Sequence, residues 1–390
     1  MNCIVVCLFL LSNILVVRVW ASETPLTTDT LPEITVVDSA QVTTAGKSVL
    51  DRQTIDVLPQ ADGAITDLLK VLPGIQFGET SNSALTGGEI LPSEISISGG
   101  RFYDNNFMID GMGNNSLLDP TSSNVTDESD VPGHSQGLFL DSSLLESITV
   151  QRSNISARYS GFTGGVVEME TRNPAQEFGG QLAYRTTRSE WTSFHVDRDQ
   201  REDFENSDNY DVQPSFRKQH SNFSLDIPLG EKMGILLAYA KDYSKISLNL
   251  LGETGHQYRE SENFFVKYRF QPNSKVDFSV TALCTPYTGT YFRKDTLNSK
   301  YELDGGGYSL NGEFIYTADI AKITLMGGGV RVKIAVLLQL IFMHGLLLIQ
   351  PIGVQSSMVK LVWRVDMEIL RNLKIILPWL CMASLCRSSY

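Results

Sequence analysis

Period-two alternation in the middle of the chain constrains the fold most. From about residue 178 onward, apolar and polar side chains alternate in long runs, separated by short turn-forming segments. One such run sets Phe264, Val266, Tyr268 and Phe270 against Asn263, Lys267 and Arg269. Because successive side chains of a β-strand point to opposite faces, these runs predict antiparallel strands with one apolar and one polar face.

Aromatic residues on the apolar face are typical of transmembrane β-barrel strands, whose outer face meets lipid and whose inner face is polar. Turns near Gly230, Pro272 and Ala318 recur at the spacing of one hairpin plus one long loop. A soluble β-sandwich also alternates and is the alternative. We expect about seven strands before Met326, far fewer than the roughly 22 of a plugged outer-membrane transporter, and therefore an incomplete barrel.

Composition excludes several functions. The 390 residues carry 32 Lys and Arg against 44 Asp and Glu, a net charge of −12, so no basic surface for nucleic acid is expected. The five His and five Cys show no ligand spacing, so we expect neither a metal site nor a cofactor. No nucleophile or acid–base motif occurs, which argues against an enzyme such as a secreted hydrolase.

The N-terminus has the pattern of an export signal. Ile4 to Val17 is almost wholly apolar, and Val19 and Ala21 form a small-residue cleavage site, so residues 1–21 are a signal peptide and the mature chain begins at Ser22. An uncleaved N-terminal anchor is the alternative.

A leader spans residues 22–47. It contains Pro32 followed by Glu33, Ile34, Thr35, Val36 and Val37, a short strand-forming segment in polar surroundings. Such a segment can add as a strand to the sheet edge of a partner, or it can be the first strand of the next unit.

The pattern of residues 48–174 predicts a compact α+β unit. Ile65, Leu68, Leu69 and Leu72 have helical spacing within 61–72, with Asp62 as the expected cap and Pro73-Gly74 as the stop. Short strands are expected at 94–98 and 106–110. A third is expected at Ile148 and Val150 after a helical turn at 144–146, and a fourth through Val166, Val167 and Met169 after a Gly-rich start at Gly161. The segment from Met112 to Gly137 is long, polar and turn-rich, which indicates an exposed loop.

The order of these motifs resembles the TonB-dependent outer-membrane receptors. The segment Glu33–Val37 is similar to a TonB box. Further similarities to the family's plug domain follow in order: Asp67–Ile75, Ile95–Arg101, Phe107–Gly111, Leu145–Arg152 with Ser156–Tyr159, and Gly164–Arg172. Ser98 and Ser160 depart from the family pattern. The resemblance implies an α+β plug domain followed by antiparallel transmembrane β-barrel strands over 175–329.

The resemblance also implies a function. It predicts a receptor in the outer membrane that takes up a scarce ligand, such as a siderophore-like metal chelate, with TonB and outer-membrane lipid as partners. The motif residues are Gly99, Gly100, Arg101, Asp110, Gly111, Arg152, Arg158, Gly164, Gly165, Glu170 and Arg172. Arg101, Arg152, Arg158, Glu168, Glu170 and Arg172 are expected either to form plug–barrel ion pairs or to be plain plug structure. Ligand contacts are expected in Gly78–Pro92 and Met112–Gly137. A soluble periplasmic plug-like binding module is the alternative.

Residues 330–390 differ from the preceding strands. Alternation is expected to stop after Gly329, and this tail has seven basic residues but two acidic ones. A change of reading frame near Gly329 would explain the tail, and the resulting truncated chain would not transport. A hydrophobic helix or an unusual buried segment are the alternatives.

Resequencing the gene tests the frame hypothesis directly. We expect a single insertion or deletion near codon 329, after which another frame restores alternating strand patterns. An uninterrupted frame together with a cellular protein whose mass ends at Tyr390 would contradict the hypothesis.

Overall fold

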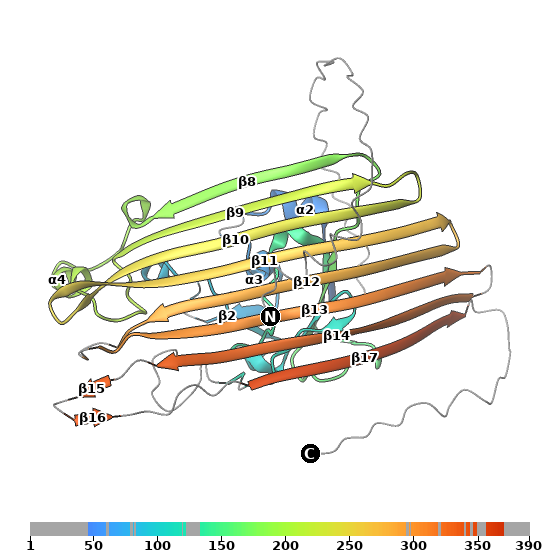
Figure 1. Ribbon diagram of the computed structural model, residues 1–390. Helices are drawn as coiled ribbons and strands as arrows, with labels where there is room; N and C mark the ends of the chain where they lie inside the picture. Colours follow the sequence, from blue (N-terminus) through green and yellow to red (C-terminus); the bar gives the residue numbers. More distant parts are fainter. Residues whose placement is uncertain are drawn as a thin grey trace, which may run out of the picture.

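The computed structural model describes residues 46–59, 62–78, 81, 83–118, 120–121, 133–293, 296, 298–318, 321–338, 341–343, 346–348 and 356–369. The predicted signal peptide and the leader up to residue 45 lie outside them. The described chain forms two bodies, a plug unit (residues 46–171) and a long curved sheet, here called the wall sheet (β8 to β14 with β17) (Figure 1). Residues 172–178 link the two.

A five-stranded mixed sheet forms the plug unit. Its spatial order is β1-β6-β7-β4-β5. The strands are β1 (Lys47–Asp51), β4 (Asn106–Ile109), β5 (Met112–Gly113), β6 (Leu145–Gln151) and β7 (Val166–Thr171). β4 and β7 are parallel and the other pairs are antiparallel. A separate ribbon pairs β2 (Ile75–Phe77) with β3 (Ile95–Ile97). The strands expected at 94–98, at 106–110, at Ile148 and Val150, and through Val166 to Met169 are therefore confirmed. The helical turn expected at 144–146 lies earlier, at η5 (Ser142–Leu144), and the strand begins at Leu145.

Short helices cover this sheet. α2 (Arg52–Val57) was not expected from the sequence, and its N-cap Asp51 accepts a hydrogen bond from Thr54 N at 2.9 Å. Bonds from Thr54 hold the pKa of the Asp51 carboxyl below its ordinary value. The remaining plug helices are α3 (Ile65–Leu68) and the 3₁₀ turns η1 (Leu69–Val71), η3 (Ala84–Thr86), η4 (Phe102–Asp104) and η5 (Ser142–Leu144).

The helix expected over 61–72 is shorter than predicted. Ile65, Leu68 and Leu69 are buried as the spacing requires, and Gly74 ends the segment with a φ of 77°. The expected cap is wrong, because the N-cap is Ala64 without a side-chain bond. The Asp62 carboxylate instead pairs with Lys218 of the wall sheet, whose Nζ lies 2.5 Å from Asp62 Oδ2.

Eight antiparallel strands form the wall sheet, in the order β17-β14-β13-β12-β11-β10-β9-β8. Their bounds are β8 (Gly179–Arg188), β9 (Ser215–Pro228), β10 (Met233–Leu250), β11 (Glu253–Asn273), β12 (Val276–Tyr291), β13 (Tyr301–Thr317), β14 (Ala321–Leu338) and β17 (Ser356–Ile369). η6 (Ser189–Trp191) and α4 (Arg201–Glu205) lie between β8 and β9, and β15 (Ile341–Met343) and β16 (Leu346–Leu348) follow β14. β8 to β14 are the seven strands expected.

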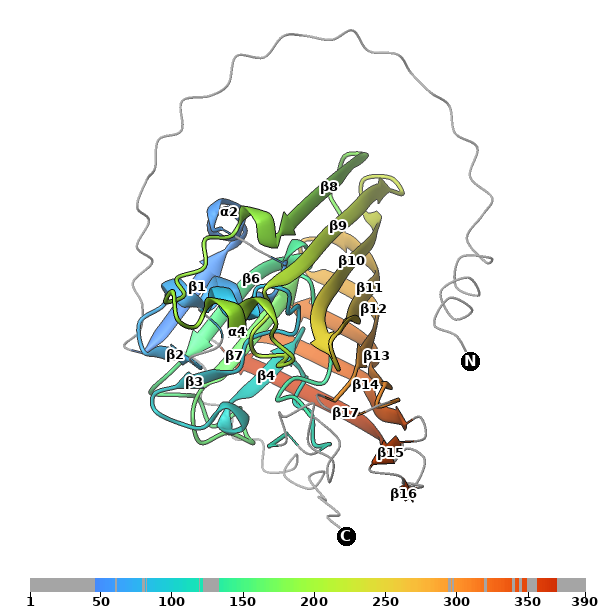
Figure 2. The ribbon, with the colours of Figure 1, turned by 90° about the vertical axis from the view of Figure 1, so that its left-hand side faces the viewer.

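The expected alternation holds along the wall strands. In β9, Asn222, Ser224 and Asp226 are buried against the plug unit, whereas Phe223 is exposed on the opposite face. Figure 2 shows the plug unit against one face of the wall sheet. Exposed apolar side chains gather on the other face, where Leu182, Tyr184, Phe223, Tyr308, Leu310, Tyr316 and Leu325 lie.

Connections at the two ends of the wall sheet differ. The strands turn tightly after β9, β11 and β13, near Gly230, Pro272 and Ala318 as expected. One expectation is wrong at the opposite end, because β10 and β11 are joined by Leu251 and Gly252 alone, both with positive φ. The additional length lies in the strands themselves, since β10 and β11 contain 18 and 21 residues against the roughly 9–11 needed to cross a bilayer.

The wall also extends beyond the boundary expected at residue 329. β14 continues to Leu338, and residues up to that point pair with β13 as far as Tyr301. Alternation persists directly after Gly329, because Val330 and Val332 are buried and Arg331 between them is exposed. The expectation that alternation stops after Gly329 is therefore wrong for these residues, and β17 pairs with β14 along Ser356–Ile369.

Apolar packing joins the two bodies. One cluster of buried side chains contains plug residues such as Ile148 and Val167 together with wall residues such as Leu236, Phe265 and Leu283. Burial of this kind contributes about 1.5–3 kcal/mol for each large side chain. No helix among the described residues is long and apolar enough to cross a lipid bilayer.

Gly165 illustrates how closely the plug elements pack. A Cβ at this position would lie 2.5 Å from Ile97 Cγ2 and 2.9 Å from Gln151 O. We expect Gly165→Ala to lower the free energy of unfolding by about 1–3 kcal/mol, because the backbone must shift to admit the methyl group. Urea denaturation followed by limited proteolysis measures this change.

The matched control is Gly179→Ala at the start of β8, where a Cβ would meet nothing within 4 Å. We expect no more than a small change in stability there. Equal effects at the two positions would show that the packing around Gly165 is looser than described.

Candidate functional site

The candidate site is the interface between the plug unit and the wall sheet. The plug unit lies against one face of the wall sheet, here called the inner face, and the polar side chains of that face contact it. The tight turns after β9, β11 and β13 define one end of the wall, called here the short-turn end. The other is called the long-loop end.

An ion pair anchors the linker near the short-turn end. Arg172 follows β7 directly, and its guanidinium lies 3.2 Å from the Asp226 carboxylate on β9. The second oxygen of that carboxylate accepts a hydrogen bond from Ala175 N at 2.9 Å. Since both oxygens are occupied and the Asp226 side chain is 7 % exposed, the pair ties the end of the plug to the wall.

A buried lysine makes the next contact. Lys267 of β11 donates hydrogen bonds to the carbonyl and the hydroxyl oxygen of Thr171, both at 3.0 Å. Asp110 accepts from Thr171 N at 2.8 Å and from its hydroxyl at 2.6 Å, and lies 3.8 Å from the Lys267 ammonium. Asp110 and Gly111 adopt φ values of 46° and 73°, and Gly111 approaches Met326 of β14 so closely that a Cβ would clash. The positive φ at both positions suits Asp followed by Gly, and this turn lies against the end of the flexible Met326 side chain.

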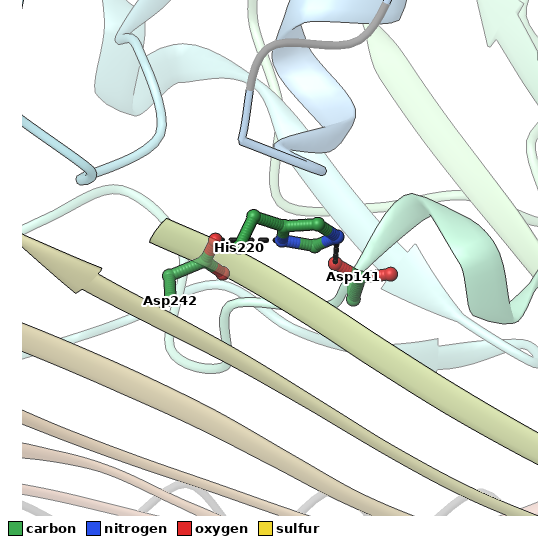
Figure 3. Close-up of side chains that lie close together, drawn as sticks. All are labelled: Asp141, His220 and Asp242. Carbon is green, nitrogen blue, oxygen red and sulfur yellow. Dashed lines mark hydrogen bonds and ion pairs between the residues drawn. The ribbon is translucent and has the colours of Figure 1, made fainter. Parts of the chain in front are cut away.

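His220 lies between two carboxylates in the middle of the interface (Figure 3). On the wall, its Nδ1 is 2.7 Å from Asp242 Oδ1, and on the plug side its Nε2 is 3.8 Å from Asp141 Oδ2. Asn263 accepts a hydrogen bond from Asp141 N at 3.1 Å. These three carboxylate and imidazole groups are the right types to hold a metal ion. The two ring nitrogens point in opposite directions, however, so the group forms a chain of contacts rather than one ligand shell.

Two further ion pairs lie toward the long-loop end. Lys218 of β9 is 2.5 Å from Asp62 and donates to Glu89 O at 3.2 Å. Arg259 of β11 is fully buried, lies 3.3 Å from the Glu89 carboxylate and stands over the Tyr291 ring at 3.6 Å from its centroid. The stacked ring and the carboxylate together compensate a guanidinium that has left water.

An open cavity of about 680 Å³ lies at the long-loop end. Residues of two plug segments line one side, and Tyr210, Asp211, Tyr287, Leu303 and Lys333 of the wall and its loops line another. The plug residues are Ser83, Thr86, Gly87, Glu89, Ile90, Leu91, Pro92, Ser93 and Glu94, and Gly133, His134, Gln136, Gly137 and Phe139. Most of them fall within the two loops from which ligand contacts are expected, and Ser93, Glu94 and Phe139 lie just beyond those loops. The cavity combines apolar rings with a few polar groups, as small-molecule sites do.

The glycine motifs named from the sequence have structural roles. Gly99 turns the chain after β3 with a φ of 80°, and a Cβ on Gly100 would lie 2.8 Å from Gly164 Cα. Gly164 and Gly165 enter β7 beside Asn105, which donates to Ile95 O at 2.7 Å. The two glycine pairs thus pack against one another inside the plug.

Most of the predicted ion-pair residues interact within the plug. Arg101 donates to the Tyr103 hydroxyl, and Arg152 donates to Pro73 O and to Ser48 Oγ. Arg158 pairs with Glu168, which also accepts from Tyr159 at 2.5 Å, and burial raises the pKa of the Tyr159 hydroxyl. Glu170 accepts from Ser147 Oγ at 3.0 Å.

Of these six residues, Arg172 pairs with the wall. Arg158 and Glu168 pair with each other inside the plug, which favours the structural alternative for these two residues over plug–barrel pairing.

Sequence reasoning missed the wall partners. Asp226 and Lys267 were recognised as members of the polar face of their strands, but nothing in the sequence indicates which plug residue each one meets. The predicted TonB box, Glu33, Ile34, Thr35, Val36 and Val37, lies outside the described residues.

Comparison with known proteins agrees with this architecture. Residues 39–167 match the family model of the TonB-dependent Receptor Plug Domain. The uncharacterized protein YddB of Escherichia coli is 31 % identical over 219 residues, which are 55 % of this chain and 28 % of that protein. The chain thus spans less than a third of this relative.

Solved structures share the fold. The outer membrane transporter YddB from Escherichia coli superposes with a TM-score of 0.69 at 23 % identity, covering 76 % of this chain and 40 % of that one. The siderophore receptor PirA from Acinetobacter baumannii gives 0.55 at 18 % identity, covering 83 % and 45 %. A plug domain followed by an antiparallel wall sheet defines the class of plugged outer-membrane proteins. This chain contains the plug domain of the TonB-dependent receptors, followed by part of a wall sheet that shares the fold of these outer-membrane proteins.

Asp226 tests whether the interface holds the plug. We expect Asp226→Asn to weaken plug attachment by about 1–3 kcal/mol, because the Arg172 guanidinium loses its anionic partner in a buried setting. Faster proteolysis of the plug unit in detergent, at unchanged strand content, would report this loosening.

Asp277→Asn is the matched control, since Asp277 pairs with Arg269 inside the wall sheet at 2.5 Å. We expect its plug to remain as resistant as in the parent chain. A similar release by both variants would mean that the wall, not the plug contact, is affected.

Proposed function

We propose that this chain acts in TonB-dependent uptake of a scarce small molecule across the outer membrane, as a receptor and not as an enzyme. The observation that carries the proposal is the position of the plug unit, held against the polar face of the wall with an open cavity at the long-loop end. Ligand would bind in this cavity, on loops of both bodies.

TonB is the proposed partner. The segment Ile34–Val37 follows Pro32 and precedes the plug unit at β1, so a pull on it would be transmitted to the first plug strand. Pairing as an added strand would need main-chain groups and few side chains. The polar contacts that hold the plug can be exchanged for water at small net cost, which suits a body that must move.

A siderophore-like chelate or another nutrient is the proposed ligand class. PirA is described as a siderophore receptor, and PfeA from Pseudomonas aeruginosa is a ferric enterobactin receptor that was solved with enterobactin. These descriptions concern those proteins and support a nutrient role here through the shared fold.

We further propose that the chain binds ligand and TonB but does not transport by itself. β8 and β17 are the two ends of the wall sheet and pair with no further strand among the described residues. Unpaired amide and carbonyl groups at such edges are costly in lipid.

The TonB contact is tested by proline substitution. Because only one of two neighbouring N–H groups in a strand faces the partner, Thr35→Pro and Val36→Pro are made separately. We expect at least one of them to reduce capture of the full chain by immobilised periplasmic TonB domain by roughly tenfold or more. Pull-down from detergent extracts measures this.

Thr28→Pro, upstream in the same leader, is the control and should leave capture unchanged. Capture that survives both box substitutions, or that is never seen with the parent chain, would contradict TonB as partner.

A further inference from the structure

The cavity at the long-loop end has an unusual charge balance. Five carboxylates line it, namely Asp62, Asp67, Glu89, Glu94 and Asp211, against three lysines, namely Lys70, Lys218 and Lys333. The surplus of negative charge bears on which ligands can enter.

Each lysine of the lining is already neutralised. Lys70 lies 2.9 Å from Asp67, Lys218 lies 2.5 Å from Asp62, and Lys333 lies 2.5 Å from Asp304. The buried Arg259 below the cavity is paired with Glu89. An anionic ligand would have to displace one of these carboxylates before it met a cation.

The histidine of the lining adds no free cation either. His134 accepts a hydrogen bond from Gln136 N at Nδ1 (3.0 Å), and its Nε2 lies 2.9 Å from Pro92 O. One acceptor and one donor nitrogen satisfy the neutral ring.

Two carboxylates of the lining have no lysine or arginine partner among the described residues. Glu94 accepts from Ser135 N at 3.0 Å and from its hydroxyl at 2.6 Å, and lies 3.5 Å from the His134 ring. Asp211 is on the loop before β9, where burial raises the pKa of its carboxyl, a bond from Tyr210 opposes this, and the charge of Glu89 raises it further. A bound cation would relieve the repulsion between the Asp211 and Glu89 carboxylates.

A separate observation concerns a buried amide in the lining of the cavity. Gln136 lines the cavity, is 3 % exposed, and its Nε2 has no hydrogen-bond partner among the described residues. A buried amide donor of this kind is costly unless an acceptor reaches it. A ligand that carries a carbonyl or hydroxyl oxygen would supply that acceptor.

We propose that this cavity takes an oxygen-bearing ligand of neutral or positive charge and rejects anionic metal chelates. The inference rests on the proposed receptor function and narrows its ligand class. It divides siderophore-like compounds by charge, since ferric catecholate complexes are anions, whereas ferric hydroxamate complexes with a pendant ammonium group are cations.

Equilibrium dialysis of the full chain in detergent tests the proposal with two probes, a ferric trihydroxamate bearing an ammonium group and a ferric complex of three catecholates. We expect the cationic probe to bind roughly tenfold tighter at low ionic strength, with the ratio shrinking as salt screens the carboxylates. Tighter binding of the anionic probe, equal binding, or no binding of either probe would overturn the proposal.

Asp211→Lys assigns the effect to the cavity. We expect this variant to lose the preference for the cationic probe, whereas Asp203→Lys, an exposed position on α4 outside the cavity lining, should keep it. Circular dichroism establishes that both variants retain strand content. An unchanged preference in Asp211→Lys would overturn the proposal.

The TonB pull-down separates this inference from the receptor function. Capture by TonB together with a preference for the anionic probe defeats the charge inference alone. Preference for the cationic probe without TonB capture defeats the receptor proposal and leaves the charge preference of the cavity standing.

Discussion

The polar inner face of the wall sheet is the constraint on which the rest of the structure depends. Strand geometry places every second side chain on that face, where Asp226 and Lys267 would be buried charges without partners if the plug offered no matching groups. Thr171 at the end of β7 accepts from Lys267, and Arg172 directly after that strand pairs with Asp226. An apolar centre around Phe265 adds area, so specificity comes from the charges and much of the adhesion from burial.

The wall was the part most accessible to sequence reasoning. Alternation is a local signal with period two, and it survives in β9 and β11 because each strand has one lipid-type face and one plug-facing face. Tight turns near Gly230 and Pro272 were equally local. The plug strands β3 and β4 followed from short apolar runs that end at glycine turns. At Gly329 the prediction ended too early, because the main-chain pairing of β14 with β13 continues as far as Leu338.

The interface contacts were beyond the reach of such reasoning. Asp62 resembles a helix cap in sequence, yet a lysine far along the chain competes for it more strongly than the local amides do. Arg158 and Glu168 are close enough in the plug to neutralise each other, whereas Arg172, four positions later than Glu168, has passed beyond β7 and reaches the wall. Only the three-dimensional arrangement decides between these outcomes, because the alternatives have equal local chemistry.

The same two ion pairs between wall and plug both hold the plug and set the charge of the cavity. Lys218 and Arg259 are wall cations whose partners, Asp62 and Glu89, belong to the plug and line the cavity. Each pair therefore removes a cation from the reach of a ligand while it fastens the plug at the long-loop end. A ligand that interacts with either carboxylate competes with the wall for it. If the proposed ligand binds in the cavity, its occupancy and the attachment of the plug are coupled through these two carboxylates, without any requirement for a distant relay.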